Sequence, residues 1–215
     1  MADDTKSNAS APHRREVFYV GGEYVPDSTG KHTLQGQMYV ERLLPIKTQG
    51  STHKPFPIVF IHGATRSGMD WLTKPDGQPG WASYFLSRGF ECYLVDLPFR
   101  GRSPWHPGNG SMMDYAAESI QAMFTACKDL AAWPQAQLHT QWPGRGTVGD
   151  PVFDQFYASG LPIVGDTVQQ EKASQAACAA LLDRLAAPAV LVAHSAGGAV
   201  PWLVADVRQR LRQFK

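Results

Sequence analysis

The 215-residue chain contains only three cysteines, and each of them lies in an apolar stretch far from the other two: Cys92, Cys127 and Cys178. Because their number is odd and their spacing is wide, we expect buried free thiols in a reducing compartment, and neither a disulfide framework nor a metal site. Residues 1–16 are polar and lack the apolar segment of a secretion signal. No stretch approaches the roughly 18 consecutive apolar residues of a membrane-spanning helix. These absences predict a soluble, cytoplasmic protein that does not bind a membrane.

The net charge of the chain is small, because 20 basic and 19 acidic residues leave a formal charge of +1. A chain so close to neutrality has no electrostatic basis for binding nucleic acid or an anionic membrane. The hydrophobic content is 43% and the charged content 18%, as in ordinary globular proteins. At this length the chain can bury one sizeable core, and we expect a single domain.

Hydrophobic patterning predicts a β-hairpin after a polar N-terminus. Residues 1–14 have no periodicity and are expected to be disordered, with structure starting a residue or two later. Segments 17–20 and 38–41 are rich in strand-forming residues. The glycine pair 21–22 and the segment 27–30 between them carry turn signals, so we expect antiparallel strands joined by turns.

The pattern then changes to alternating strands and helices. Near-continuous apolar runs at 57–61 and 92–96 predict parallel strands that are covered on both faces. Helical periodicity predicts crossover helices at 80–90 and 166–185, and an apolar stripe predicts one more helix at 200–214. The expected fold class is therefore α/β, an antiparallel hairpin followed by a parallel sheet with crossover helices.

The segment 189–200, AVLVAHSAGGAV, carries the most informative motif of the chain. Its first five residues predict a strand, and a tight turn around Ser195 leads into a helix. A serine at such an elbow lies at the carboxyl end of the strand, where the first N–H groups of the next helix can stabilise an oxyanion. The crowded backbone needs small residues two positions to either side, and Ala193 and Gly197 supply them.

Two further motifs precede this elbow. The sequence HGAT at 62–65 follows one predicted strand, and DLPFRGRS at 96–103 follows the next. In kind and order, the three motifs resemble the oxyanion loop, the D-x-x-x-R-G-x-S turn and the nucleophile elbow of the α/β-hydrolase superfamily. Within that superfamily, residues 62–103 resemble the atypical bacterial esterases and their fungal relatives. The resemblance extends over residues 15–215.

The resemblance implies a serine hydrolase that cleaves a small apolar carboxylic ester. It assigns Ser195 as the nucleophile and the backbone N–H groups of Ala64 and Ala196 as the oxyanion hole. This chemistry requires no metal and no cofactor. The implied partner is a small-molecule ester, with no role for nucleic acid or membrane.

The sequence departs from the family pattern in two places. Ala193 replaces the first glycine of the elbow, and the sequence stops 20 residues after Ser195, before the strands that carry the family's acid and histidine. We therefore expect an incomplete domain over residues 15–215 that hydrolyses esters far more slowly than a longer relative. The alternative is a hydrolase-derived binding or regulatory module, or a non-functional fragment. In either case the elbow strand would form an exposed sheet edge through which the chain self-associates.

Other polar residues near these motifs are expected to be structural. His194 is adjacent to Ser195 on a predicted strand and should point to the opposite face and pack there. His62 is expected to brace the oxyanion loop, and Asp96 to hold the Arg-Gly turn that follows it. Asp206 lies about three helical turns beyond the serine, roughly 15 Å away and out of its reach.

Residues 104–165 contain six prolines and scattered large aromatics, which predicts an insertion that covers the sheet. A helix is expected to start at Ser111, with Asp114 completing an S-x-x-D cap. His106 and His139 lie in this loop-rich region and are the remaining candidate bases. Such a cap commonly lines an apolar substrate pocket, although packing of the cap onto the sheet would explain the same residues.

Overall fold

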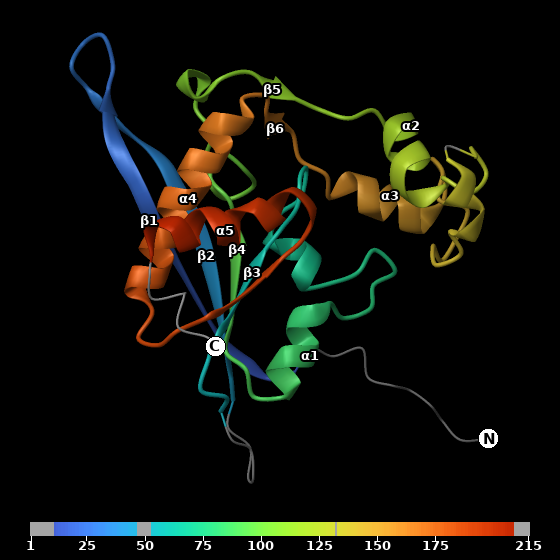
Figure 1. Cartoon of the computed structure of the whole chain (residues 1–215), viewed down its shortest axis with the longest axis horizontal. Helices are drawn as coiled ribbons and strands as arrows, with labels where there is room; N and C mark the ends of the chain where they lie inside the picture. The colour runs from blue at the N-terminus through green and yellow to red at the C-terminus, as the bar shows by residue number, and fades with distance from the viewer. Residues whose placement is uncertain (1–10, 47–52, 132, 209–215) are drawn as a thin grey trace.

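A computed structural model describes residues 11–46, 53–131 and 133–208, and it has a mixed α/β architecture (Figure 1). Five strands form the central sheet in the order β1-β2-β4-β3-β7. These strands are β1 (His13–Pro26), β2 (His32–Pro45), β3 (Ile58–Ile61), β4 (Cys92–Asp96) and β7 (Val190–Ala193). Among the described residues, no helix has the length and apolar character needed to cross a bilayer.

The N-terminal strands β1 and β2 form the expected antiparallel hairpin. β1 begins at His13, so the expected disorder over residues 1–14 is wrong for its last two positions, while residues 1–10 lie outside the described part. The glycine pair 21–22 is not a turn, because both glycines lie inside β1 at φ 67° and 83°. A Cβ on Gly21 would come within 3.0 Å of the Cα of Ala177, so glycine here lets a helix cross the hairpin closely.

The middle of the sheet is parallel, as the apolar runs predict. β3 pairs in parallel with both β4 and β7, and every residue of β3 and β4 is buried. β2 joins β4 in the antiparallel sense and so connects the hairpin to the parallel strands. The carboxyl ends of β3, β4 and β7 consequently lie at one edge of the sheet, where ligands bind in open α/β folds.

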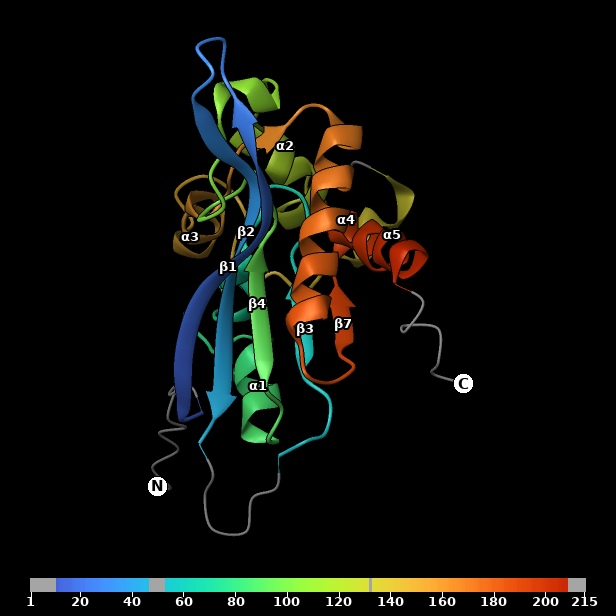
Figure 2. The same ribbon diagram turned by 90° about the vertical axis from the view of Figure 1, so that its left-hand side faces the viewer.

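Helices cover both faces of this sheet. α4 (Thr167–Arg184) and α5 (Ala199–Val207) lie together on one face (Figure 2). They contribute buried residues such as Leu181 and Val204 to the core on that face. α1 (Trp81–Ser87) packs on the other through Ala82 and Leu86.

The expected helix at 166–185 is confirmed, and the side chain of Asp166 caps its first turn. The helix expected at 80–90 is shorter than predicted, and its Trp81 and Tyr84 are exposed. The C-terminal helix buries Val200 and Val204 as expected, whereas the part of the predicted stripe beyond residue 208 lies outside the described residues.

All three cysteines are free and buried, as predicted from their spacing. Burial raises the pKa of the Cys92 and Cys178 thiols to about 12. Both thiols therefore stay protonated at neutral pH and have little reactivity.

The insertion at 104–165 folds over one end of the sheet. Its two ends are joined by β5 (Met112–Met113) and β6 (Ile163–Val164), and between them lie α2 (Ala117–Ile120), a π-helical turn (Gln121–Thr125) and α3 (Pro151–Ala158). The expected start of this helix at Ser111 is wrong, because helical structure begins at Ala117 and the Ser111 carbonyl accepts the N–H of Gly165 next to the β5–β6 pair. Asp114 instead accepts the N–H of Tyr115. We refer to residues 104–165 as the cap.

Candidate active site

The chain turns sharply after β7, with a backbone strain at Ser195 that the sequence pattern did not predict. The strand ends at Ala193, and Ser195 adopts φ 52°, a conformation that is costly for any residue with a Cβ. A helical turn (Ser195–Gly198) then leads directly into α5. The exposed serine is thereby held at the tip of a sharp strand-to-helix turn, at the carboxyl edge of the sheet.

The small residue at position 197 is a steric requirement of this elbow. A Cβ on Gly197 would overlap the backbone carbonyl oxygen of His62, which belongs to the neighbouring loop after β3. The adjacent Gly198 has open space around the same position. Only the first of these two glycines is thus needed to bring the elbow against the loop.

We expect Gly197→Ala to displace the elbow and to slow the labelling of Ser195 by a fluorophosphonate at least about tenfold. Overpacking of this kind costs about 1–3 kcal/mol, so the melting temperature should also fall by several degrees. Gly198→Ala is the matched control and should leave both quantities unchanged. Equal labelling rates for the two variants would contradict the packing argument.

The loop after β3 lies directly against the elbow. A Cβ on Gly63 would come within 3.0 Å of the Ser195 Cβ and 2.9 Å of the His194 Nδ1, so only glycine fits between them. Ala64 lines the same cavity as Ser195. Ala196 is the second residue of the helical turn, where backbone N–H groups have no acceptor within the turn. The structure thus brings together the three residues to which the sequence assigned the nucleophile and the oxyanion hole.

His62 is buried behind this loop and is fixed in one tautomer. Its Nε2 accepts the Leu97 N–H at 2.9 Å, so the proton resides on Nδ1, which donates to the Gly63 carbonyl at 2.8 Å. Burial lowers the pKa of His62 to about 4, which leaves the ring neutral at pH 7. With both nitrogens engaged, His62 braces the loop as expected.

Asp96, at the end of β4, also holds backbone in place. Its buried carboxylate accepts the backbone N–H groups of Gly68 and Arg102 at 2.8 and 2.9 Å, and pairs with the Arg102 guanidinium at 2.8 Å. Burial opposes ionisation, but the Arg102 charge and these N–H groups outweigh it and hold the pKa of Asp96 below its ordinary 3.8. This geometry fits the structural role expected for Asp96.

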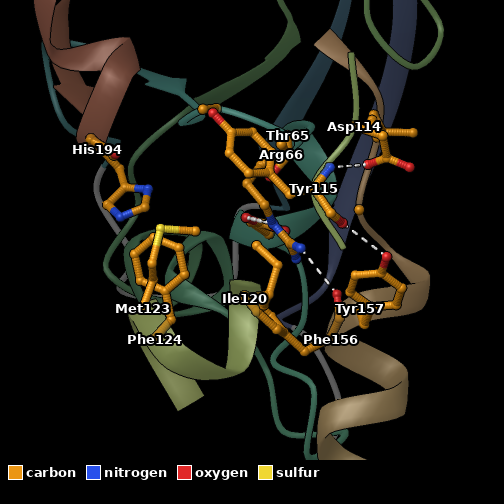
Figure 3. Close-up of a pocket in the computed structure, with 15 residues that line it drawn as sticks. Thr65, Arg66, Asp114, Tyr115, Ile120, Met123, Phe124, Phe156, Tyr157 and His194 are labelled. Carbon is orange, nitrogen blue, oxygen red and sulfur yellow. Dashed lines mark hydrogen bonds and ion pairs between the residues drawn. The ribbon is translucent and has the colours of Figure 1, made fainter. Parts of the chain in front are cut away.

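A cavity of about 440 Å³ opens in front of Ser195, between the elbow, the loop and the cap (Figure 3). The sheet side contributes the elbow and the loop after β3. The cap contributes mostly apolar and aromatic side chains: Tyr115, Ile120, Met123, Phe124, Phe156, Tyr157 and Leu161. The expected apolar pocket beneath the cap is therefore present, and it adjoins the candidate nucleophile.

Arg66 joins the loop to the cap, a role that the sequence analysis missed. Its guanidinium pairs with Asp70 through two contacts of 2.7 Å and donates to the Phe156 carbonyl at 3.0 Å and the Ser159 hydroxyl at 2.7 Å. It also lies 4.4 Å from the Phe156 ring centroid. The Arg66 charge is thus neutralised within the cavity wall and is not available to bind an anionic substrate.

The expectation that His194 packs on the opposite face is wrong. His194 is exposed and lines the cavity, with its ring toward Met123 and Phe124 in Figure 3. The alternation of strand faces does not apply, because β7 ends at Ala193 and the left-handed Ser195 redirects the chain. Among the described histidines, only this one lines the cavity. The two candidate bases of the cap, His106 and His139, do not line the cavity; they lie next to 3-10 turns at 107–109 and 134–138.

No protein-family model matches the chain. A protein named "Probable secreted lipase phiG", from Fungal sp. (strain ATCC 74256), is 45% identical over 194 residues, which is 90% of this chain and 49% of that protein. The chain therefore spans about half the length of this relative.

A solved structure described as a novel bacterial esterase matches with a TM-score of 0.65 and 22% identity, over 94% of this chain and 67% of that chain. This likeness shows that the two proteins share a fold.

Proposed function

We propose that this protein is a serine hydrolase of the α/β-hydrolase superfamily that cleaves carboxylic esters, with Ser195 as its nucleophile. The observation that carries the proposal is the position of Ser195, at positive φ on a strand-to-helix elbow that opens into an apolar cavity. The names of the two related proteins support the reaction class.

In the proposed mechanism, a base removes the Ser195 proton and the serine oxygen attacks the ester carbonyl. The backbone N–H groups of Ala64 and Ala196 bind the oxyanion of the tetrahedral intermediate. The carbonyl–oxygen bond then breaks, the alcohol leaves with the proton, and water hydrolyses the acyl-enzyme through a second tetrahedral intermediate. His62 does not serve as this base, because it is neutral and both of its nitrogens are engaged.

The cavity points to a neutral, apolar substrate. The cap supplies aliphatic and aromatic surface, and the cation of Arg66 is already paired with Asp70. The Asp114 carboxylate lies at the same cavity and would repel an anionic acyl group. We therefore propose an uncharged ester with a small apolar acyl group.

A series of nitrophenyl esters tests this substrate class. Butyrate should be hydrolysed faster than acetate, and the anionic hemisuccinate should be the poorest substrate. Met123→Trp should fill part of the cavity and lower kcat/KM for butyrate more than for acetate. Met113→Trp, at an exposed residue outside the cavity lining, is the control. A preference for the hemisuccinate would overturn the assignment.

The fungal relative is named a secreted protein, which weighs against the cytoplasmic location expected from the sequence. The buried cysteines fit either compartment, because burial keeps their thiols from pairing. By this relationship we propose that the protein acts outside the cell.

We also propose that the 215-residue chain self-associates through β7. Within the described residues, β7 has β3 as its one strand neighbour, and Val190 is 44% exposed. On the following helix α5, Trp202 is 79% exposed. An uncovered strand edge beside apolar side chains favours pairing with a second chain.

Sedimentation velocity at several concentrations tests this self-association. The sedimentation coefficient should rise with concentration for the wild-type chain and rise less for Trp202→Ser. Tyr24→Ser, at an exposed aromatic residue on the hairpin, is the control and should behave as the wild type. A compact monomer at all concentrations would contradict the proposal.

A further inference from the structure

Arg100 is buried under the candidate oxyanion loop without an acidic partner. The residue is 7% exposed, and no ion pair between described residues includes it. Its Nε has no hydrogen-bond acceptor among the described residues. Burial lowers the pKa of Arg100 to about 10, so the guanidinium still carries its charge at pH 7. A buried, unpaired cation is costly to keep.

Arg102, two residues further along the same turn, provides a contrast. Its guanidinium pairs with the buried carboxylates of Asp96 and Glu41 at 2.8 and 2.7 Å. These contacts neutralise its charge and explain its position. The charge of Arg100 has no comparable structural explanation.

The recorded hydrogen bond of Arg100 goes to the loop itself. Its Nη1 donates to the Gly63 carbonyl at 2.9 Å, and the same oxygen accepts the Nδ1 proton of His62 at 2.8 Å. This carbonyl and the N–H of Ala64 belong to one peptide group, whose electrons are delocalised over O, C and N. Two donors on the oxygen, one of them charged, withdraw electron density and make the N–H a stronger donor.

We propose that Arg100 is a positioning residue for the oxyanion hole. Its guanidinium holds and polarises the Gly63–Ala64 peptide, so that the Ala64 N–H binds the developing oxyanion. The inference rests on the proposed function, because it requires Ser195 chemistry beside Ala64. Negative charge on the substrate oxygen develops fully only in the transition state, so the contribution appears in turnover rather than in substrate binding.

The test compares Arg100→Met and Arg100→Lys with the control Arg88→Met. Arg88 is exposed and directly follows helix α1. We expect Arg100→Met to lower kcat for nitrophenyl butyrate by about ten- to a hundredfold with little change in KM, somewhat less than the loss of an oxyanion-hole donor itself. Affinity for a trifluoromethyl ketone, which mimics the tetrahedral intermediate, should fall by a similar factor. Arg100→Lys should restore part of both, and Arg88→Met should match the wild type.

A second measurement covers the case in which Arg100→Met does not fold. The amide proton resonance of Ala64 should move upfield in Arg100→Lys relative to the wild type, because the bond to the Gly63 carbonyl is weakened. An unchanged resonance would overturn the inference, as would an unchanged kcat in a folded Arg100→Met. Failure of the proposed function has a different signature, since the wild-type protein itself would then show no labelling at Ser195.

Discussion

Ser195→Ala is expected to lower the rate of nitrophenyl butyrate hydrolysis by at least about 10³-fold, to the residual rate that substrate binding and the oxyanion donors supply on their own. Without the side-chain oxygen no acyl-enzyme can form, while the cavity and both candidate oxyanion donors stay in place. Steady-state hydrolysis with the wild-type and variant proteins at equal concentration measures the effect. Because Ser195 is exposed, the substitution should leave the melting temperature unchanged.

Ser119→Ala is the matched control for this experiment. Ser119 is an exposed serine on the cap helix α2 and is absent from the cavity lining. Its removal should leave hydrolysis as in the wild type. If Ser195→Ala retained the wild-type rate, the nucleophile would have to be another group.

Asp96→Ala is expected to lower the free energy of unfolding by about 2–5 kcal/mol, mainly because two backbone N–H groups lose their buried acceptor, at about 1–3 kcal/mol each. The substitution leaves the Arg102 guanidinium without one of its two carboxylates and removes the acceptor of two backbone N–H groups. Urea unfolding followed by circular dichroism provides the measurement. Asp76→Ala is the control, because this exposed carboxylate pairs with Lys74 on the surface and should contribute less than about 1 kcal/mol.

The contribution of Asp96 to the free energy of unfolding should decrease as the pH falls. The pKa of Asp96 in the folded protein lies below 3.8, so the unfolded chain takes up the proton first as the pH falls. Its contribution is therefore complete above the unfolded pKa and is lost as the pH falls through the folded one. The difference in stability between wild type and Asp96→Ala should be largest near neutrality and should shrink below pH 3.8. A difference that grows in acid would contradict this assignment.

Local sequence patterns predicted the elements whose burial or capping depends on residues within the element itself. The apolar runs of β3 and β4 are buried on both faces, and α4 begins at the Asp166 cap. The patterns failed where a distant segment decides. Ser111 lies beside the β5–β6 pair because the N–H of residue 165 donates to its carbonyl. Gly21 lies within β1 and packs closely against α4 instead of forming a turn.

The candidate site divides in the same way. Motifs located Ser195 and Ala64, because an elbow and a loop after a strand are encoded within a few residues. Arg66 and Arg100 were missed, since their contacts join positions 90 and 37 residues apart in the sequence. No local pattern records such partners. His194 was misplaced because the left-handed turn at Ser195 interrupts the alternation of strand faces.

Covalent labelling tests directly whether Ser195 is the nucleophile. The folded chain is treated with a fluorophosphonate, digested and analysed by mass spectrometry, with Ser195→Ala alongside. We expect a single adduct on the peptide that contains Ser195, located at that serine and absent from the variant. An adduct on another residue, or equal labelling of Ser195→Ala, would contradict the assignment of Ser195 as the nucleophile.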